Sequence, residues 1–181
     1  DIFLFDRDYQ GLVEILGRPP LSQLADNGIY RAMIPELMGR AYRYMGDTKN
    51  AEKHTRQTIE IGAAYRPSSI ISASFNLQAL SRAYANSKQF DKALATANNS
   101  IELQAESDDS IMGTWNSANR AMILGMAGQR DESLADLERL LKPPLGLSRW
   151  DLYLSPDCDF FREDERFNKL ARPTNLEEAD Q

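Results

Sequence analysis

The side chains that most often do chemistry in proteins are few in this chain, and they lack the partners that chemistry requires. His54 is the only histidine, and the helical register of its segment turns it toward solvent. General acid–base catalysis needs a second group within hydrogen-bond reach of the imidazole, and the sequence supplies none beside it. Cys158 is the only cysteine, and Asp157 and Asp159 surround it with negative charge that opposes thiolate formation. We therefore expect no catalytic residue.

Metal and cofactor motifs are missing as well. The carboxylates of residues 157–165 lack the alternate spacing and the central glycine of an EF-hand loop, so we expect them to cap helices and to face water. A single cysteine excludes a multi-cysteine zinc site. The chain has no Gly-rich phosphate loop, no Gly-x-Ser-x-Gly and no His-Glu-x-x-His. We expect no metal, no cofactor and no enzymatic activity in this domain, and place any catalytic activity in a fused domain outside this chain.

Composition limits the partners. The chain has 181 residues, 42% of them hydrophobic, which suits one globular domain over 1–181. Its formal net charge of −6 disfavours nucleic acid, because phosphate contacts need a basic face. No apolar run approaches the ~20 residues that cross a bilayer, so we expect no membrane insertion. The start, Asp1-Ile2-Phe3, suggests part of a longer protein. We expect a cytoplasmic location, or a periplasmic one if a membrane span precedes Asp1.

An internal repeat organises the chain. Two independent markers recur at spacings of 42 and then 40 residues. The first marker comprises Tyr42, Tyr84 and Leu124, and the second comprises Ala51, Ala93 and Ser133. Apolar residues around the markers follow helical spacing, and no segment alternates with period two. We therefore predict an all-α fold of antiparallel helix pairs over residues 28–65, 68–106 and 108–142.

The turns and the chain ends complete this organisation. Gly46 and Gly128 follow the last periodic residues of their helices, where a left-handed residue ends a helix. Residues 1–17 match the second helix of a unit and are predicted to form a half repeat. Residues 143–172 are predicted to cap the apolar face of the last helix, because the end of a helical array must be covered. This cover comes from Leu147, Trp150, Leu152, Tyr153, Phe160, Phe161 and Phe167. Residues 173–181 read as an acidic tail.

The marker residues resemble the tetratricopeptide repeat (TPR). Gly39, Tyr42, Gly46 and Ala51 match its motif in the first unit, Leu80, Tyr84, Phe90 and Ala93 match in the second, and Gly128 matches in the third. The family repeats every 34 residues, so the spacing of 40–42 predicts longer helices or longer connections. The resemblance implies a right-handed solenoid of stacked helix pairs with a C-terminal capping segment.

The C-terminal segment carries a narrower resemblance. Residues 137–148, followed by Trp150-Asp151-Leu152 and residues 154–167, are similar to the segment that closes the TPR regions of certain bacterial regulators. Those regulators include adenylate-cyclase-like, kinase-like and winged-helix proteins. The resemblance implies a regulatory or scaffold module, the C-terminal part of a larger signalling or transcription-control protein.

The family binds extended or helical protein segments in a concave groove lined by the first helices. Register places these residues there: Arg40, Arg43, Tyr44, Phe75, Gln78, Arg82, Asn86 and Trp115. Arginine can direct two N–H donors at one carboxylate, so the hypothesis is a groove for an acidic or C-terminal peptide segment with an apolar anchor near Trp115. Chaperone tails are disfavoured, because Arg40 and Arg82 stand where that family's clamp places asparagine.

Three alternatives stay open. The arginines could pair only with neighbouring Glu and Asp residues of their own chain. The module could self-associate, or it could be a small-ligand sensor with a pocket near Trp115 and Trp150.

Overall fold

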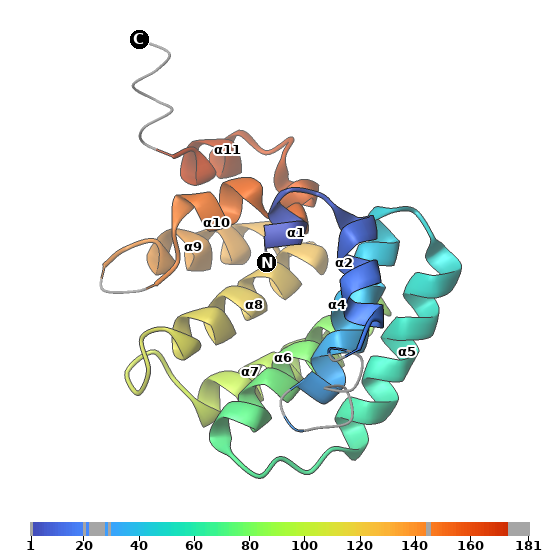
Figure 1. The fold of residues 1–181 in the computed structure, drawn as a ribbon. Helices are drawn as coiled ribbons and strands as arrows, with labels where there is room; N and C mark the ends of the chain where they lie inside the picture. Colours follow the sequence, from blue (N-terminus) through green and yellow to red (C-terminus); the bar gives the residue numbers. More distant parts are fainter. Residues whose placement is uncertain (1, 20, 22–27, 29, 144–145, 174–181) are drawn as a thin grey trace.

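The computed structural model describes residues 2–19, 21, 28, 30–143 and 146–173, and all secondary structure in these residues is helical (Figure 1). The prediction of an all-α fold is confirmed for this part of the chain. Three helix pairs follow one another, each joined by a three-residue turn: α4 (Tyr30–Tyr44) with α5 (Thr48–Ala64), α6 (Ile70–Asn86) with α7 (Phe90–Leu103), and α8 (Met112–Met126) with α9 (Arg130–Leu140). Each pair lies inside one of the ranges 28–65, 68–106 and 108–142.

The same turn closes the first helix of every pair. The N–H groups of Asp47, Gln89 and Gln129 each donate to the marker carbonyls of Tyr42, Tyr84 and Leu124 over 2.9 Å. This bond requires the residue before each donor to adopt a left-handed conformation. Gly46 (φ 77°) and Gly128 (φ 85°) do so as predicted, and Lys88 (φ 59°) takes the same position in the second pair. The repeat is therefore a repeat of backbone hydrogen bonds as well as of residue types.

Buried asparagines join successive pairs. Asn76 of α6 donates through Nδ2 to the carbonyl of Gly62 at the end of α5, over 3.1 Å. Asn116, 40 residues later on α8, donates through Nδ2 to the carbonyl of Ser100 over 3.0 Å and to that of Gln104 over 3.1 Å. These carbonyls lie at helix ends, where the helix supplies few N–H partners, and the Ser100 carbonyl also accepts from the N–H of Gln104. The first helix of one pair is thus fixed against the second helix of the pair before it.

The N-terminal residues pack on the first pair. Helix α2 (Tyr9–Gly17) lies against α4, and the short helix α1 (Ile2–Phe5) lies beside α2 (Figure 1). Asp8 caps α2 by accepting from the N–H of Gly11. A buried cluster of apolar side chains from these three helices joins them: Leu4, Leu12, Leu16, Ile34 and Ala41. The range 1–17, predicted as a half repeat, therefore contains two helices, of which the first is a single turn.

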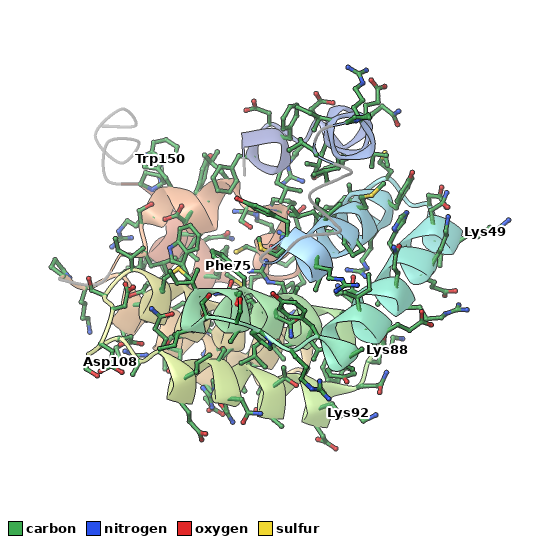
Figure 2. All side chains as sticks on the ribbon, turned by 60° about the horizontal axis from the view of Figure 1, so that its bottom comes forward. Lys49, Phe75, Lys88, Lys92, Asp108 and Trp150 are labelled. Carbon is green, nitrogen blue, oxygen red and sulfur yellow. The ribbon has the colours of Figure 1, made fainter. Side chains whose placement is uncertain are left out.

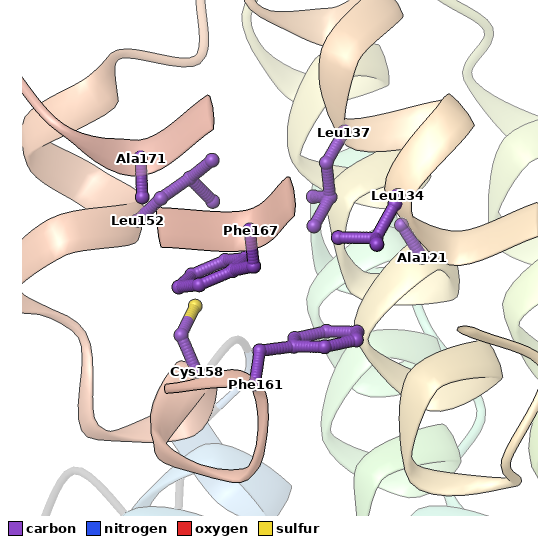
Figure 3. Packing of buried hydrophobic residues seen from close by; sticks show 8 residues of the cluster. All are labelled: Ala121, Leu134, Leu137, Leu152, Cys158, Phe161, Phe167 and Ala171. Carbon is purple, nitrogen blue, oxygen red and sulfur yellow. The ribbon is translucent and has the colours of Figure 1, made fainter. Parts of the chain in front are cut away.

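The C-terminal segment covers α8 and α9. It consists of α10 (Arg149–Leu154), the 3-10 helix η1 (Pro156–Phe161) and α11 (Glu165–Ala171). Phe161 and Phe167 stack with ring centroids 5.2 Å apart, and both are fully buried (Figure 3). They pack with six other buried side chains: Ala121, Leu134, Leu137, Leu152, Cys158 and Ala171.

Two aromatic residues that were expected to cover the last helix remain partly exposed. Trp150 and Tyr153 are 40% and 42% exposed, because they pack edge to face against each other on the outer side of α10. Of the predicted acidic tail, residues 174–181 lie outside the described residues.

The seat of the cap on α8 gives a test of this packing. A Cβ on Gly125 would overlap the rings of Phe160 and Phe161. We predict that Gly125→Ala lowers the free energy of unfolding by about 1–3 kcal/mol, the usual range for overpacking a core, measured by urea denaturation. Gly17→Ala is the matched control, because no atom lies within 4 Å of the place that its Cβ would take, and it should leave stability unchanged or slightly higher. Equal effects of the two changes would contradict the close contact.

Candidate functional site

The helices α4, α6 and α8 pack side by side, and two cavities lie on the face that they share with the chain ends. A cavity of 230 Å³ is lined by five of the predicted groove residues, namely Arg40, Arg43, Tyr44, Arg82 and Asn86. A second cavity of 140 Å³ is lined by Arg40 and Arg82 again, and by Gln78 and Trp115. Phe75 lines neither cavity. Register thus brings seven of the eight residues to one face, which we call the α4–α6–α8 face.

Arg40 on this face is already paired within the chain. Its guanidinium binds the carboxylate of Asp157, which reaches it from η1, and the hydroxyl of Tyr44 donates to the same carboxylate. Arg40 Nε also lies 3.7 Å from Glu36 Oε1. The side chains of Arg40 and Glu36 are 7% and 5% exposed, so these charges are largely removed from water.

The pKa values follow this geometry. Burial by itself raises the pKa of the Asp157 carboxyl, but the charges of Arg40 and Arg82 and the hydrogen bond from Tyr44 hold it below its ordinary range. For Arg40, burial lowers the pKa, and the charges of Asp157 and Glu36 outweigh that effect and raise it. The pair is therefore ionised at neutral pH, which agrees with the rule that buried charges persist only when paired.

The packing of the cap fixes the backbone that carries Asp157 beside Arg40. Its neighbours Pro156 and Cys158 are buried, and Phe161 at the end of the same 3-10 helix is fully buried. Removing one such aromatic side chain from its core costs about 3–5 kcal/mol. The carboxylate is thus a counter-ion of Arg40 that the fold itself supplies. The alternative in which a groove arginine pairs with acids of its own chain holds for this residue.

A second ion pair ties the chain ends together. Arg7, just after α1, donates two hydrogen bonds of 2.7 and 2.8 Å to the two carboxylate oxygens of Asp159. Arg7 has a φ of 57°, so it follows the helix in a left-handed conformation, and its side chain reaches the cap. The N-terminal and C-terminal segments therefore meet over the α4–α6–α8 face (Figure 1).

Arg43 and Arg82 differ from Arg40 because their hydrogen-bond partners are uncharged. Arg82 Nε donates to Asn119 Oδ1 over 2.7 Å, and Arg43 makes one long bond of 3.4 Å to the hydroxyl of Thr55. Within the described ranges, neither guanidinium has a carboxylate within 4 Å. Both are half-buried, and burial lowers the pKa of Arg43. These two arginines are the cations of the face that a ligand could reach.

Among the polar and aromatic residues of the face, some make contacts within the chain and others are exposed to solvent. Gln78 is buried and donates to Asn116 Oδ1 over 2.8 Å, so its amide serves packing between α6 and α8. Asn86 is half-exposed at the end of α6. Trp115 is 46% exposed, whereas Phe75 is half-buried on α6 (Figure 2). Trp115 is therefore the aromatic residue of the predicted set that could meet a partner.

The two side chains with reactive groups, His54 and Cys158, are both held by packing. His54 does not point freely into solvent, as its register led us to expect: it is half-buried and stacks on Tyr42 with centroids 5.5 Å apart, because α5 lies against α4. Burial lowers its pKa, so it is neutral at pH 7. Cys158 is fully buried, and burial raises the pKa of its thiol to about 12. Burial therefore disfavours the thiolate form of Cys158, and the charges of Asp157 and Asp159 act in the same direction.

Sequence reasoning missed Asp157 as a residue of the face, since it was read only as a capping or solvated acid. Its role depends on a contact between segments 117 residues apart, and no local pattern reports such a contact. In the described part of the chain, no three His, Cys, Asp or Glu side chains converge as metal ligands would. Among those same residues, none of the helices combines the length and apolarity that crossing a membrane requires.

Removing Arg40 tests its structural role. We predict that Arg40→Met lowers the free energy of unfolding by about 3 kcal/mol or more, because Asp157 and Glu36 would stay buried without a cation. Arg82→Met removes the same charge from the repeat-equivalent position and should cost about 1 kcal/mol, the scale of one hydrogen bond. Urea denaturation at pH 7 measures both. Similar losses in the two variants would show that Arg40 has no special role.

The pH dependence of stability gives a separate test. Because the folded pKa of Asp157 lies below the value of about 3.9 for an unfolded aspartate, its contribution is complete above about pH 4. It is lost as the pH falls through the folded pKa, by up to about 1.4 kcal/mol per pH unit. The stability advantage of the wild type over Asp157→Asn should therefore shrink between pH 4 and pH 2.5. A constant difference from pH 7 to pH 2.5 would rule out the depressed pKa.

Comparisons with protein-family models, with curated proteins and with solved structures gave no match for this chain.

Proposed function

We propose that this chain is a protein-interaction module of the tetratricopeptide kind, which binds an acidic protein segment on the α4–α6–α8 face. The observation that carries the proposal is the pair of half-buried arginines, Arg43 and Arg82, that line the 230 Å³ cavity without a carboxylate within 4 Å in the described residues. Both arginines can attract the carboxylate of an anionic partner, and three carboxylates of the chain, Glu36, Asp157 and Asp159, line the same cavity. An arginine also matches a carboxylate in geometry, since it can direct two donors at it.

The arrangement of the helices supports the same proposal. Each first helix packs on the next first helix, and each second helix packs on the following pair, as in a solenoid whose first helices line a concave surface. The right-handed sense of that solenoid is part of the proposal. The module would serve as a scaffold or regulatory part of a larger signalling or transcription-control protein, acting in the cytoplasm and doing no chemistry itself.

The structure changes which residues we assign to binding. Arg40 and Gln78 form hydrogen bonds within the chain, so we assign them a structural role and no contact with the ligand. The polar ligand contacts come from Arg43, Arg82 and Asn86, and Trp115 supplies the exposed apolar anchor. The acidic group of the partner would enter the 230 Å³ cavity with the cap in place.

A panel of short peptides tests this assignment. We predict that peptides with Asp, Glu or a free C-terminal carboxylate bind, and that amidated peptides without acids bind at least ten times more weakly in fluorescence anisotropy. Arg82→Gln should weaken binding about 10- to 100-fold, since charge-assisted hydrogen bonds contribute about 1.5–3 kcal/mol. Arg18→Gln, which changes an exposed arginine just after α2, is the matched control and should bind as the wild type does. Undiminished binding by Arg82→Gln would contradict the proposal.

A small-ligand sensor is the second candidate. Glu36 and Arg40 line the 230 Å³ cavity, and their Oε1 and Nε atoms are buried without a hydrogen-bond partner among the described residues. A ligand with both a donor and an acceptor could satisfy them, and a cavity of about 150 Å³ already holds a molecule the size of benzene. A metabolite that raises Tm and competes with the acidic peptides would favour the sensor. Concentration-dependent sedimentation would instead indicate self-association.

A further inference from the structure

A third cavity adjoins the α4–α6–α8 face, where α5 passes the turn between α6 and α7. Its volume is 550 Å³, within the range of about 300–1,000 Å³ that ligand sites occupy. Three cations line it, Arg43, Arg56 and Lys88, and the one carboxylate among its lining residues is Glu52. Thr48 and Ser87 add hydroxyl groups. This turn-end cavity therefore gathers positive charge and hydrogen-bond donors in a chain whose net charge is negative.

The cations of the turn-end cavity are not used by the fold. Arg43 makes only its 3.4 Å bond to Thr55, and the side chains of Arg56 and Lys88 make neither a hydrogen bond nor an ion pair with any described residue. Glu52 likewise forms no ion pair within those residues. Arginines with a structural role elsewhere, such as Arg40, Arg120 and Arg139, each bind a carboxylate.

The backbone at Lys88 adds an independent observation. Lys88 stands where the first and third pairs have Gly46 and Gly128, in the left-handed conformation that costs a residue with a Cβ. Arg7 is the other such residue in the described ranges, and its side chain binds Asp159. A glycine would make the Lys88 turn at lower cost, as it does in the neighbouring pairs. No hydrogen bond or ion pair of the Lys88 side chain with a described residue offsets this strain.

We propose that the turn-end cavity binds a phosphoryl group, with Lys88, Arg56 and Arg43 as the cationic contacts. A phosphoryl group at neutral pH carries a charge near −2 and three acceptor oxygens, so it suits three cations opposed by one carboxylate. Lysine binds phosphate as a point charge and arginine binds it through paired donors. The phosphoryl group belongs to a small phosphorylated molecule or to a phosphorylated side chain of a partner. The site adjoins the acidic-segment site proposed above, because Arg43 and Asn86 line both cavities, but Arg56 and Lys88 line the turn-end cavity and do not line the 230 Å³ cavity.

Inorganic pyrophosphate is the first probe, titrated into the whole chain by isothermal calorimetry. We expect one pyrophosphate per chain, with affinity that falls as salt rises. Lys88→Gly should weaken binding at least about tenfold, the loss of one charge-assisted contact, yet raise Tm by about 2–4 °C because the strained turn is relieved. Loss of binding together with a gain in stability would separate a binding lysine from a structural one. Wild-type affinity in Lys88→Gly, or no binding at 5 mM by the wild type, overturns the proposal.

Two further variants distinguish the site from general charge effects. Arg56→Ala should weaken pyrophosphate binding, whereas Lys53→Ala removes one exposed cation from the same helix outside the cavity and should not. Equal losses in both would show nonspecific attraction and contradict the site. Arg82→Gln should keep full pyrophosphate affinity, because Arg82 does not line the turn-end cavity. The pyrophosphate test therefore gives a clear outcome even if the acidic-segment proposal fails.

The source of the phosphoryl group is decided by two added titrations. A phosphoserine peptide is compared with its unphosphorylated form, and both are compared with pyrophosphate. Tighter binding of the phosphopeptide than of pyrophosphate indicates a modified partner, and the reverse order indicates a small phosphorylated molecule. Binding of the unphosphorylated peptide that is equally tight would overturn the phosphoryl assignment.

Discussion

The buried contact of Arg40 with Asp157 and Tyr44 constrains the rest of this structure. A guanidinium 7% exposed requires a carboxylate, and the chain supplies two: Glu36 from the same helix and Asp157 from the cap. The first pair and the last segment of the chain must therefore meet. Both cavities of the α4–α6–α8 face include Arg40 and Asp157 in their walls, so this one contact also sets the shape of the candidate site.

The repeat shows how one residue type can do different work at equivalent positions. Arg40 and Arg82 are 42 residues apart, and the next equivalent position holds Met122. The cap reaches Arg40 with a carboxylate, whereas Arg82 bonds to a neutral amide on α8. Position in the repeat therefore predicts which face a side chain occupies. The partner of that side chain depends on segments that the repeat does not describe.

The sequence predicted the parts of the fold that depend on local physics. Apolar periodicity and the glycines gave the helix pairs, since helix formation and termination are decided within a few residues. It placed seven of the eight groove residues on one face by register. It did not predict the Arg40–Asp157 contact, the stacking of His54 on Tyr42 or the exposure of Trp150. Each of these depends on how separate elements meet, and spacing along the chain carries no information about that.

The sequence predicts the turn at Lys88, but only the structure shows the backbone conformation of this lysine. The spacings of 42 and 40 residues that relate Tyr42 to Tyr84 and Leu124 also relate Gly46 to Lys88 and Gly128. In the sequence alone, Lys88 is only an exception to the glycine found at the equivalent positions 46 and 128. Read with the φ angles, it adopts the backbone conformation of its two glycine equivalents and gives up their freedom from strain. All three turns make the same backbone hydrogen bond, and Lys88 makes it with more conformational strain than Gly46 or Gly128. Because the turn itself does not favour lysine, we look for the role of Lys88 in its side chain.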